Sequence, residues 1–155
     1  MGKAVASMTI QTLSPDNHEM IKGAYDIHQQ VTYSPWSYAA FADCITPPYQ
    51  MIALGDADVI GYAIILMVAD EATLMDIGVS PGARGKGAGK ALTQKVIDIC
   101  TQKKMATIWL EVRASNSIAL NLYKSHGFTG QEVRKKYYEA KDGREDAIIM
   151  KRNNF

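Results

Sequence analysis

The sequence predicts a single mixed α/β (α+β) domain in which a mostly antiparallel sheet is flanked by helices on both faces. Strand-like and helix-like segments alternate along the chain, and three strand-like segments follow one another in its middle. Two further strand-like segments close the chain, and no repeat, linker or low-complexity stretch divides it. At 155 residues, the chain is long enough for one core of ordinary size. We therefore expect one domain at residues 8–152, preceded by a flexible leader at residues 1–7.

The first half of the chain is expected to form one strand, two helices and a pair of strands. Ser14 and Pro15 predict a helix start, because a capping hydroxyl and a first-turn proline both favour helix N-termini, and this helix should run to about Gln30. Ser37 is expected to cap a second, short helix that ends near Ile45. The expected strands are residues 8–13, 50–54 and 59–68, with a hairpin turn at residues 55–58.

The second half continues the alternation. A β-branched and apolar strand is expected at residues 73–79, where Ser80 and Pro81 interrupt it, and an apolar helix that ends near Cys100 follows a glycine-rich run. The remaining elements are expected to be a strand at residues 106–112, a helix at residues 116–126 that ends at Gly127, and strands at residues 129–138 and 146–152.

Composition and charge argue against several classes of function. The chain is 47% hydrophobic and 21% charged with a net charge of +1, which is typical of a globular protein without direct nucleic-acid binding. Its longest apolar run, residues 59–68, is too short to span a membrane. Cys44 and Cys100 form no CxxC pair, and the three histidines lack metal-ligand spacing. We therefore expect a cytoplasmic protein with buried thiols, no metal site and no membrane association.

The glycine-rich run between the central strand and the following helix is the first candidate site. Glycines let an anion approach the backbone, and the N–H groups at a helix start carry partial positive charge. A P-loop is excluded because Ala91 follows Gly89-Lys90, and a dinucleotide fingerprint would need glycine at position 90. The alternative is a glycine-rich turn with surface lysines. The expected phosphate site comprises Arg84, Gly85, Lys86, Gly87, Ala88, Gly89 and Lys90.

A carboxylate in an apolar strand is the second candidate. Because side chains alternate along a strand, Glu111 lies opposite to Leu110 and Val112. It is either a general base whose partial burial raises its pKa, or a surface charge paired with a neighbour such as Arg113. On the following helix, Tyr123 lies seven residues after Asn116 on the same face, near the same end of the sheet.

These segments resemble one known family. The pattern R-x-x-G-x-G at residues 84–89 is similar to the pyrophosphate-binding signature of the GCN5-related N-acetyltransferases (GNAT). The segments WLEVRASN, LY, GF, YY and DGREDAIIM further resemble the ribosomal-protein-alanine N-acetyltransferases, the RimI type, and the similarity covers nearly all of residues 8–150. The chain departs from that pattern at Arg84, where glutamine is more frequent, and at the small Ala88. The resemblance implies the acyl-CoA N-acyltransferase fold.

The resemblance also implies roles for individual residues. Glu111 would accept a proton, Tyr123 would donate one, and the acetyl group would come from acetyl-CoA. The implied acceptor is the α-amine of a protein N-terminal alanine, as in small-subunit ribosomal protein eighteen. This acceptor suits a modest base, because an α-amine has a pKa of roughly 8 and a lysine amine about 10.4. Asn116, Ile77, Gly78, Val79 and the loop at residues 84–90 would bind the cofactor.

Four aromatic residues are candidates for acceptor binding. Tyr33, Trp36, Tyr137 and Tyr138 are expected to flank a peptide N-terminus and to hydrogen-bond its backbone, or else to be loop anchors. Two other functions stay open at this point. One is an acetyltransferase for lysine side chains or small amines, and the other is a non-catalytic acyl-CoA-binding module, which would not need Glu111 and Tyr123 together.

Overall fold

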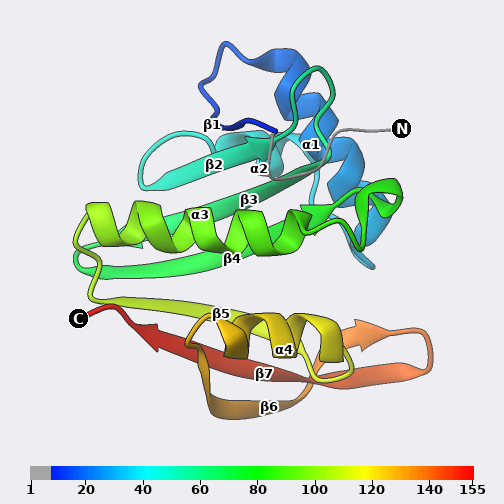
Figure 1. Cartoon of the computed structure of the whole chain (residues 1–155). Coiled ribbons are helices and arrows are strands. Elements are labelled where there is room, and N and C mark those ends of the chain that lie inside the picture. Colours follow the sequence, from blue (N-terminus) through cyan, green and yellow to red (C-terminus); the bar gives the residue numbers. More distant parts are fainter. Residues whose placement is uncertain (1–7) are drawn as a thin grey trace.

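The computed structural model describes residues 8–155 and shows one seven-stranded sheet with four α-helices around it (Figure 1). The predicted order of elements and the mixed fold class are confirmed, whereas the leader predicted at residues 1–7 lies outside the described residues. In chain order the elements are β1 (Ile10–Thr12), α1 (His18–Val31), α2 (Tyr38–Asp43), β2 (Tyr49–Leu54), β3 (Gly61–Val68), β4 (Glu71–Val79), the 3-10 turn η2 (Pro81–Ala83), α3 (Ala88–Gln102), β5 (Thr107–Arg113), α4 (Ser117–Ser125), β6 (Thr129–Ala140) and β7 (Gly143–Asn153).

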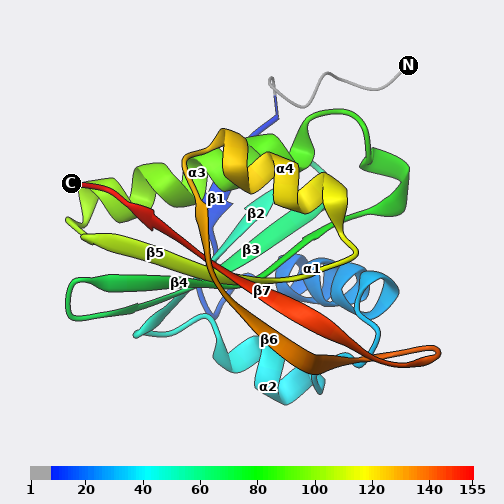
Figure 2. The ribbon, with the colours of Figure 1, turned by 90° about the horizontal axis from the view of Figure 1, so that it is seen from below.

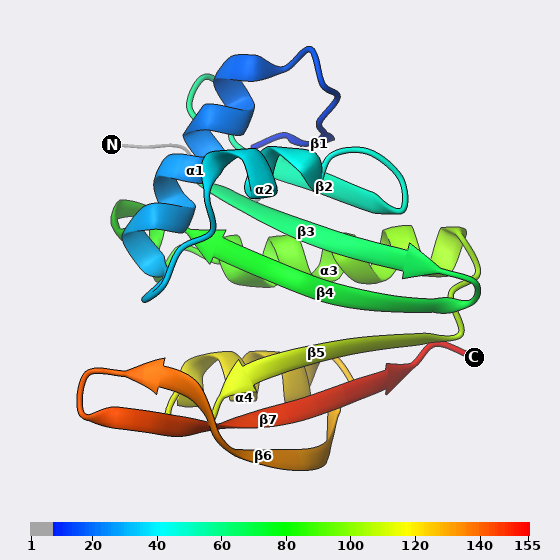
Figure 3. The same cartoon turned by 180° about the vertical axis from the view of Figure 1, so that it is seen from behind.

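The sheet has helices on both faces, as Figure 2 shows. Its strand order is β1-β2-β3-β4-β5-β7-β6, and every neighbouring pair is antiparallel except β4 and β5. Helices α3 and α4 lie on one face, and α1 and α2 lie on the other face over β2, β3 and β4 (Figures 2 and 3). Figure 3 shows no helix on that second face over β5, β7 and β6. Strand β5, which carries Glu111, and strand β6, which carries Tyr137 and Tyr138, are therefore not covered by a helix on this face.

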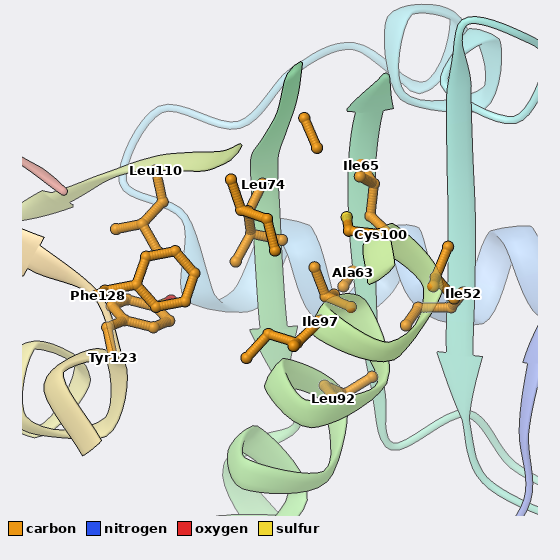
Figure 4. Close-up of a cluster of buried hydrophobic side chains, with 14 of the residues drawn as sticks. Ile52, Ala63, Ile65, Leu74, Leu92, Ile97, Cys100, Leu110, Tyr123 and Phe128 are labelled. Atoms are coloured by element: carbon orange, nitrogen blue, oxygen red, sulfur yellow. The ribbon is translucent and has the colours of Figure 1, made fainter. Parts of the chain in front are cut away.

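The larger core lies between the sheet and α3 (Figure 4). On α3, Leu92, Val96 and Cys100 are buried at helical spacing, and Lys95, which interrupts the apolar pattern in the sequence, is exposed. Figure 4 shows Leu92, Ile97 and Cys100 directed toward the strands. Burial of one such side chain stabilises the fold by about 1.5–3 kcal/mol. The second core lies under α1 and α2, around Phe41 and Tyr62.

The first predicted helix begins later than expected. Helix α1 starts at His18 after Asn17, whereas Ser14 was expected to cap it. The Ser14 hydroxyl instead donates to Asn17 Oδ1 at 3.1 Å, so the residues before the helix form a turn of their own. The expected cap of α2 is confirmed, since Ser37 Oγ accepts the N–H of Ala40 at 3.2 Å.

Strands β4 and β5 separate along their length, and this separation positions the site. Their pairing runs from Glu71 opposite Thr107 to Leu74 opposite Leu110 and stops there, although both strands continue. Beyond that point β4 contains a β-bulge, because Ile64 pairs with Asp76 whereas Ile65 pairs with Leu74. Figure 3 shows the two strands diverging toward their carboxyl ends.

Candidate active site

A cavity of about 730 Å³ lies where β4 and β5 diverge. It is lined by residues from β4, β5, α4, the loop between α1 and α2, and β6. The structure thus brings together eight residues that the sequence marked as candidates: Ile77, Glu111, Asn116, Tyr123, Tyr33, Trp36, Tyr137 and Tyr138.

Glu111 lies on the face of β5 that the alternation predicts. Leu110 and Val112 are buried in the α3 side of the sheet, whereas Glu111 is exposed. Its Oε1 is 3.2 Å from Nη1 of Arg134, and the side chain of Glu111 keeps 33% of its exposure. The charge is thus paired with β6, and not with Arg113 as the alternative interpretation supposed. Glu111 is thus an exposed and paired charge, as the alternative interpretation expected, and it also lines the cavity, as a general base would have to.

Tyr123 is buried on α4 and lines the same cavity. Its ring packs edge-on against Phe128, with the centroids 5.8 Å apart. Burial, and secondarily the charge of Asp76, raises the pKa of Tyr123 to about 12. Its phenol therefore keeps its proton at neutral pH, and the structure shows no acceptor for that proton among the described residues. Tyr123 is thus a hydrogen-bond donor directed at the cavity.

The glycine-rich loop has the conformation that a close anion approach requires. Gly85 has φ 77°, and Gly87, the residue before α3, has φ 86°, a left-handed conformation that favours glycine. No other atom lies within 4 Å of a Cβ built on either residue. The first helical bond of α3 runs from the N–H of Ala91 to the carbonyl of Gly87 at 3.0 Å, so the N–H groups at positions 88–90 precede the helical ladder.

Gly89 has a different role in the same loop. A Cβ there would lie 3.4 Å from Cδ2 of Leu122, because α3 and α4 approach each other at this point. Arg84 and Lys86 are exposed beside the loop, and Ala88 is buried at the helix start. Helix α3 therefore begins within the motif, at Ala88, which places the helix dipole behind the loop.

The backbone of β4 presents two N–H groups to the open side. The N–H of Ser80 donates to the carbonyl of Ile60 at 2.8 Å, and an antiparallel ladder alternates, so the N–H of Gly78 also faces β3. The N–H groups of Ile77 and Val79 then face away from β3, toward the diverging β5. The N–H of Ile77 also donates to Oδ1 of Asp76 at 3.0 Å.

Asn116 is the cap of α4 and not its first helical residue. Its Oδ1 accepts the N–H of Ala119 at 3.2 Å. This bond fixes the side-chain amide with its Nδ2 group free of partners among the described residues, at the rim of the cavity. A rigid donor at this position is suited to a carbonyl of a bound cofactor.

The loop between α1 and α2 contributes two aromatic residues with different environments. Tyr33 is 59% exposed, so it is no buried loop anchor. Trp36 is half-buried, and its indole packs against the ring of His28 with the centroids 5.1 Å apart. Trp36 thus combines the two roles considered from the sequence, because it anchors the loop and also lines the cavity.

Tyr137 and Tyr138 both line the cavity although they are adjacent in β6. Adjacent residues of a regular strand point to opposite faces. The register between Arg134 and Tyr138 shifts, however, and Lys136 within this irregularity has φ 52° and donates its N–H to Asp146 Oδ1 at 2.9 Å. The irregular backbone lets both phenol rings lie at the cavity, with their centroids 5.1 Å apart.

Arg113 joins the two aromatic walls, a role that the sequence did not reveal. Its guanidinium lies 4.6 Å from the ring centroid of Tyr138 and 6.0 Å from that of Tyr33. It also donates to Glu145 and to the carbonyl of Glu139, each at 2.9 Å. The only signal in the sequence is that Arg113 shares the strand face of Glu111.

Other predicted features have the following outcomes. Burial raises the pKa of both thiols, that of Cys100 to about 11, and both cysteines are buried and unpaired as expected. Glu71, at the start of β4, accepts a hydrogen bond from the Trp109 indole at 3.4 Å. Within residues 8–155, no group of three or more potential ligands is arranged for a metal, and no helix is long and apolar enough to cross a membrane.

Comparison with known proteins agrees with this geometry. The model of the acetyltransferase (GNAT) family matches residues 16–128. The [ribosomal protein bS18]-alanine N-acetyltransferase of Escherichia coli strain K12 is 41% identical over 142 residues, 91% of this chain and 96% of that protein. The protein of the same name from Haemophilus influenzae is 41% identical over 128 residues, 81% of this chain and 87% of that protein.

Solved structures show the same relationship. The crystal structure of the ribosomal-protein-S18-alanine N-acetyltransferase from Escherichia coli matches with a TM-score of 0.88 and 40% identity, covering 94% of this chain and 93% of that one. The NatC complex bound to Gag peptide and CoA matches with a TM-score of 0.83 at 21% identity, over 94% of this chain and 98% of that one, and so shares the fold. The resemblance predicted from the sequence is confirmed, and the chain belongs to the acetyltransferase (GNAT) family.

Proposed function

We propose that this protein transfers the acetyl group of acetyl-CoA to the α-amine of a protein N-terminal alanine, that of ribosomal protein bS18. The observation that supports the proposal is the cavity that Glu111 and Tyr123 share with the four aromatic candidates; residues 84–90 do not line it and are proposed to bind a more distant part of the cofactor. The relatives with 41% identity are named for the same reaction. A ribosomal substrate would place the reaction in the cytoplasm.

Acetyl-CoA would enter along the opening between β4 and β5. The proposed pyrophosphate contacts are the amides at positions 85–90, with Arg84, Lys86 and Lys90 adding charge. Asn116 would contact the extended part of the cofactor from α4. The amide of Val79 faces the opening, where it would bond to the cofactor and to the thioester oxygen as negative charge develops on it. The amide of Ile77, which already donates to Asp76, would contact the same group only as a shared donor.

Glu111 is proposed to accept the proton that the attacking amine loses, directly or through one water molecule. An α-amine with a pKa of roughly 8 is neutral often enough near pH 7 for a carboxylate to suffice. The amine then attacks the thioester carbon, the carbon–nitrogen bond forms, and the carbon–sulfur bond breaks. Neither cysteine lines the cavity, so the acetyl group would pass directly to the amine.

Tyr123 is proposed to stabilise the departing thiolate by donating a hydrogen bond to it. The resemblance implied a proton donor here. The raised pKa of Tyr123, about 12 against roughly 8.5 for an alkyl thiol, favours the hydrogen bond over complete proton transfer. The hydrogen bond itself needs no transfer. The thiolate can take its final proton from the amine side or from water.

One assay separates this function from its alternatives. CoA release should be measured with three acceptors. The first is a peptide that begins with alanine and contains an internal lysine, the second is this peptide with its α-amine blocked, and the third is a set of free small amines. We expect rapid release with the first peptide only, and mass spectrometry should find the acetyl group on the α-amine. Acetylation of the internal lysine or of the small amine would assign a different acceptor, and cofactor binding without release would indicate a non-catalytic module.

A further inference from the structure

A buried polar network connects the two sides of the cavity. His28, on the last turn of α1, is 1% exposed, and among residues 8–155 it is the one buried residue whose side chain can carry a positive charge. It was given no role from the sequence. Its Nδ1 lies 2.8 Å from Oδ2 of Asp76 on β4, and its Nε2 lies 3.0 Å from the backbone nitrogen of Trp36. A buried polar side chain is stable only when its donors and acceptors are hydrogen-bonded.

The partners determine which nitrogen carries the proton. A backbone N–H can only donate, so Nε2 must accept the bond from Trp36 and carries no proton. The proton of the neutral ring is therefore on Nδ1, which donates to Asp76. The Tyr62 hydroxyl donates to the same carboxylate oxygen at 2.6 Å. Burial, and then the charge of Asp76, raises the pKa of Tyr62, so this phenol remains a donor.

Two side chains of α1 bind the backbone N–H and the backbone carbonyl of Trp36 in the loop. His28 accepts the N–H of Trp36, and the Tyr25 hydroxyl donates to the carbonyl of Trp36 at 2.8 Å. Tyr25 and His28 are three positions apart on α1 and so lie on one helix face. The loop segment that carries Tyr33 and Trp36 is thereby fixed relative to the sheet.

Asp76 connects the same network to the strand of the proposed acyl site. Its Oδ2 accepts from His28 and Tyr62, and its Oδ1 lies 3.0 Å from the N–H of Ile77. Figure 3 shows the carboxyl-terminal end of α1 beside that of β4. One carboxylate therefore contacts both the histidine that holds the acceptor loop and an amide proposed to face the thioester.

We propose that His28 is a positioning residue, whose neutral ring holds the acceptor loop in register with the acyl-bearing strand through Trp36 and Asp76. This inference rests on the proposed function, in which the loop at residues 32–37 binds the acceptor peptide. Protonation of Nε2 would place two donors 3.0 Å apart and release Trp36, while the bond to Asp76 would persist. Asp76 is the charged group that faces the ring, and the phenols of Tyr62 and Tyr25 are its other titratable neighbours.

Steady-state kinetics on three variants test whether the hydrogen bonds of His28 and Tyr25 to Trp36 position the loop for the acceptor peptide. In His28→Phe the N–H of Trp36 loses its acceptor, and the KM for the alanine peptide should rise about tenfold, the upper end for one lost hydrogen bond. The KM for acetyl-CoA should stay within about twofold of wild type, since its proposed contacts are elsewhere. His28→Gln keeps an acceptor and a donor in the ring's place, and should restore the peptide KM to within about threefold. Tyr25→Phe removes only the hydrogen bond to the carbonyl of Trp36, and should raise the peptide KM about threefold.

A binding titration supplies a readout that a merely structural role would not move. The acetylated product peptide reports binding without turnover. Its dissociation constant should rise about tenfold in His28→Phe and stay within about threefold of the wild-type value in His28→Gln, because only glutamine keeps an acceptor for the N–H of Trp36. Equal dissociation constants in His28→Phe and His28→Gln would overturn the inference, and so would an unchanged peptide KM in Tyr25→Phe together with His28→Phe. If His28→Phe does not fold, an unchanged peptide affinity in Tyr25→Phe still overturns it.

The control separates this inference from the proposed function. Tyr33→Ala and Trp36→Ala remove loop side chains and keep the backbone bonds to His28 and Tyr25, although the Trp36 ring also packs against His28. A raised peptide KM in these variants, with no effect in the His28 and Tyr25 variants, would retain the acceptor loop and reject the positioning role. No effect on peptide KM in any of these five variants would reject the loop as the acceptor site.

Discussion

Replacing Tyr123 by phenylalanine isolates one hydroxyl at the proposed leaving-group position. Tyr123 is 5% exposed, and its ring contacts Phe128, so phenylalanine keeps the packing. The lost hydroxyl has no acceptor among the described residues, so the substitution leaves no protein group unsatisfied. The melting temperature should therefore change little, and any loss of rate should report on the reaction.

The size of the loss follows from the proposed contact. A hydrogen bond to a charged group contributes about 1.5–3 kcal/mol, which corresponds to a fall in kcat of about 10- to 160-fold. The KM for acetyl-CoA should remain nearly constant, because the charge on sulfur exists only as the bond breaks. Since the pKa of Tyr123 is about 12, the phenol does not titrate below pH 10, and the loss should be the same at every pH from about 6 to 9.

The assay is initial-rate CoA release with saturating acetyl-CoA and alanine peptide across that pH range. Tyr49→Phe is the matched control, since it removes a hydroxyl from β2 outside the cavity and should leave kcat unchanged. A Tyr123→Phe enzyme that keeps more than about half of the wild-type kcat would refute the proposed contact. A loss of kcat that disappears at one end of the pH range would show that the phenol titrates there, so that burial does not raise its pKa above this range.

Three further predictions concern the base, the cofactor loop and the fold. Glu111→Gln should lower kcat about 100-fold near pH 7, with the deficit narrowing as the free amine becomes plentiful at higher pH, whereas Arg134→Gln breaks the same ion pair and should retain activity within about threefold. Gly87→Val should weaken acetyl-CoA binding at least about tenfold by calorimetry, while Gly143→Val, at another positive φ with open space around it, should leave the affinity unchanged. Gly78→Ala places a Cβ 2.5 Å from the Tyr62 ring and should destabilise the fold by about 1–3 kcal/mol in denaturant titrations, against no change for Gly82→Ala, where the space is open.

The sequence predicted the features that follow from local patterns. The alternation of Leu110, Glu111 and Val112, and the left-handed glycine at position 127 after α4, both depend on residues close together in the chain. Helix boundaries were less accurate, because Asn17 competes with Ser14 for the turn before α1. A side-chain competition of this kind depends on geometry that composition does not specify.

The contacts across the cavity could not be predicted from local patterns. The alternative interpretation of Glu111 named Arg113, two residues away, as an example of a partner, but Glu111 pairs with Arg134 on β6. Arg113 pairs instead with Glu145 on β7. Both choices depend on the register of β5, β7 and β6, and that register contains irregularities in β6 that no periodicity in the sequence reveals.

The bulge in β4 explains why one stretch of chain serves both the core and the site. In a regular strand Leu74 and Asp76 would share a face, and Leu74 is buried against α3. A carboxylate on that face would be buried among apolar side chains, at a cost of several kcal/mol. The unpaired Met75 shifts the register by one residue, so Asp76 pairs with Ile64 on the face of α1, where His28 and Tyr62 are its partners. The same irregularity lies where the pairing with β5 has ended, so the local change that opens the cavity also directs Asp76 toward the acceptor loop.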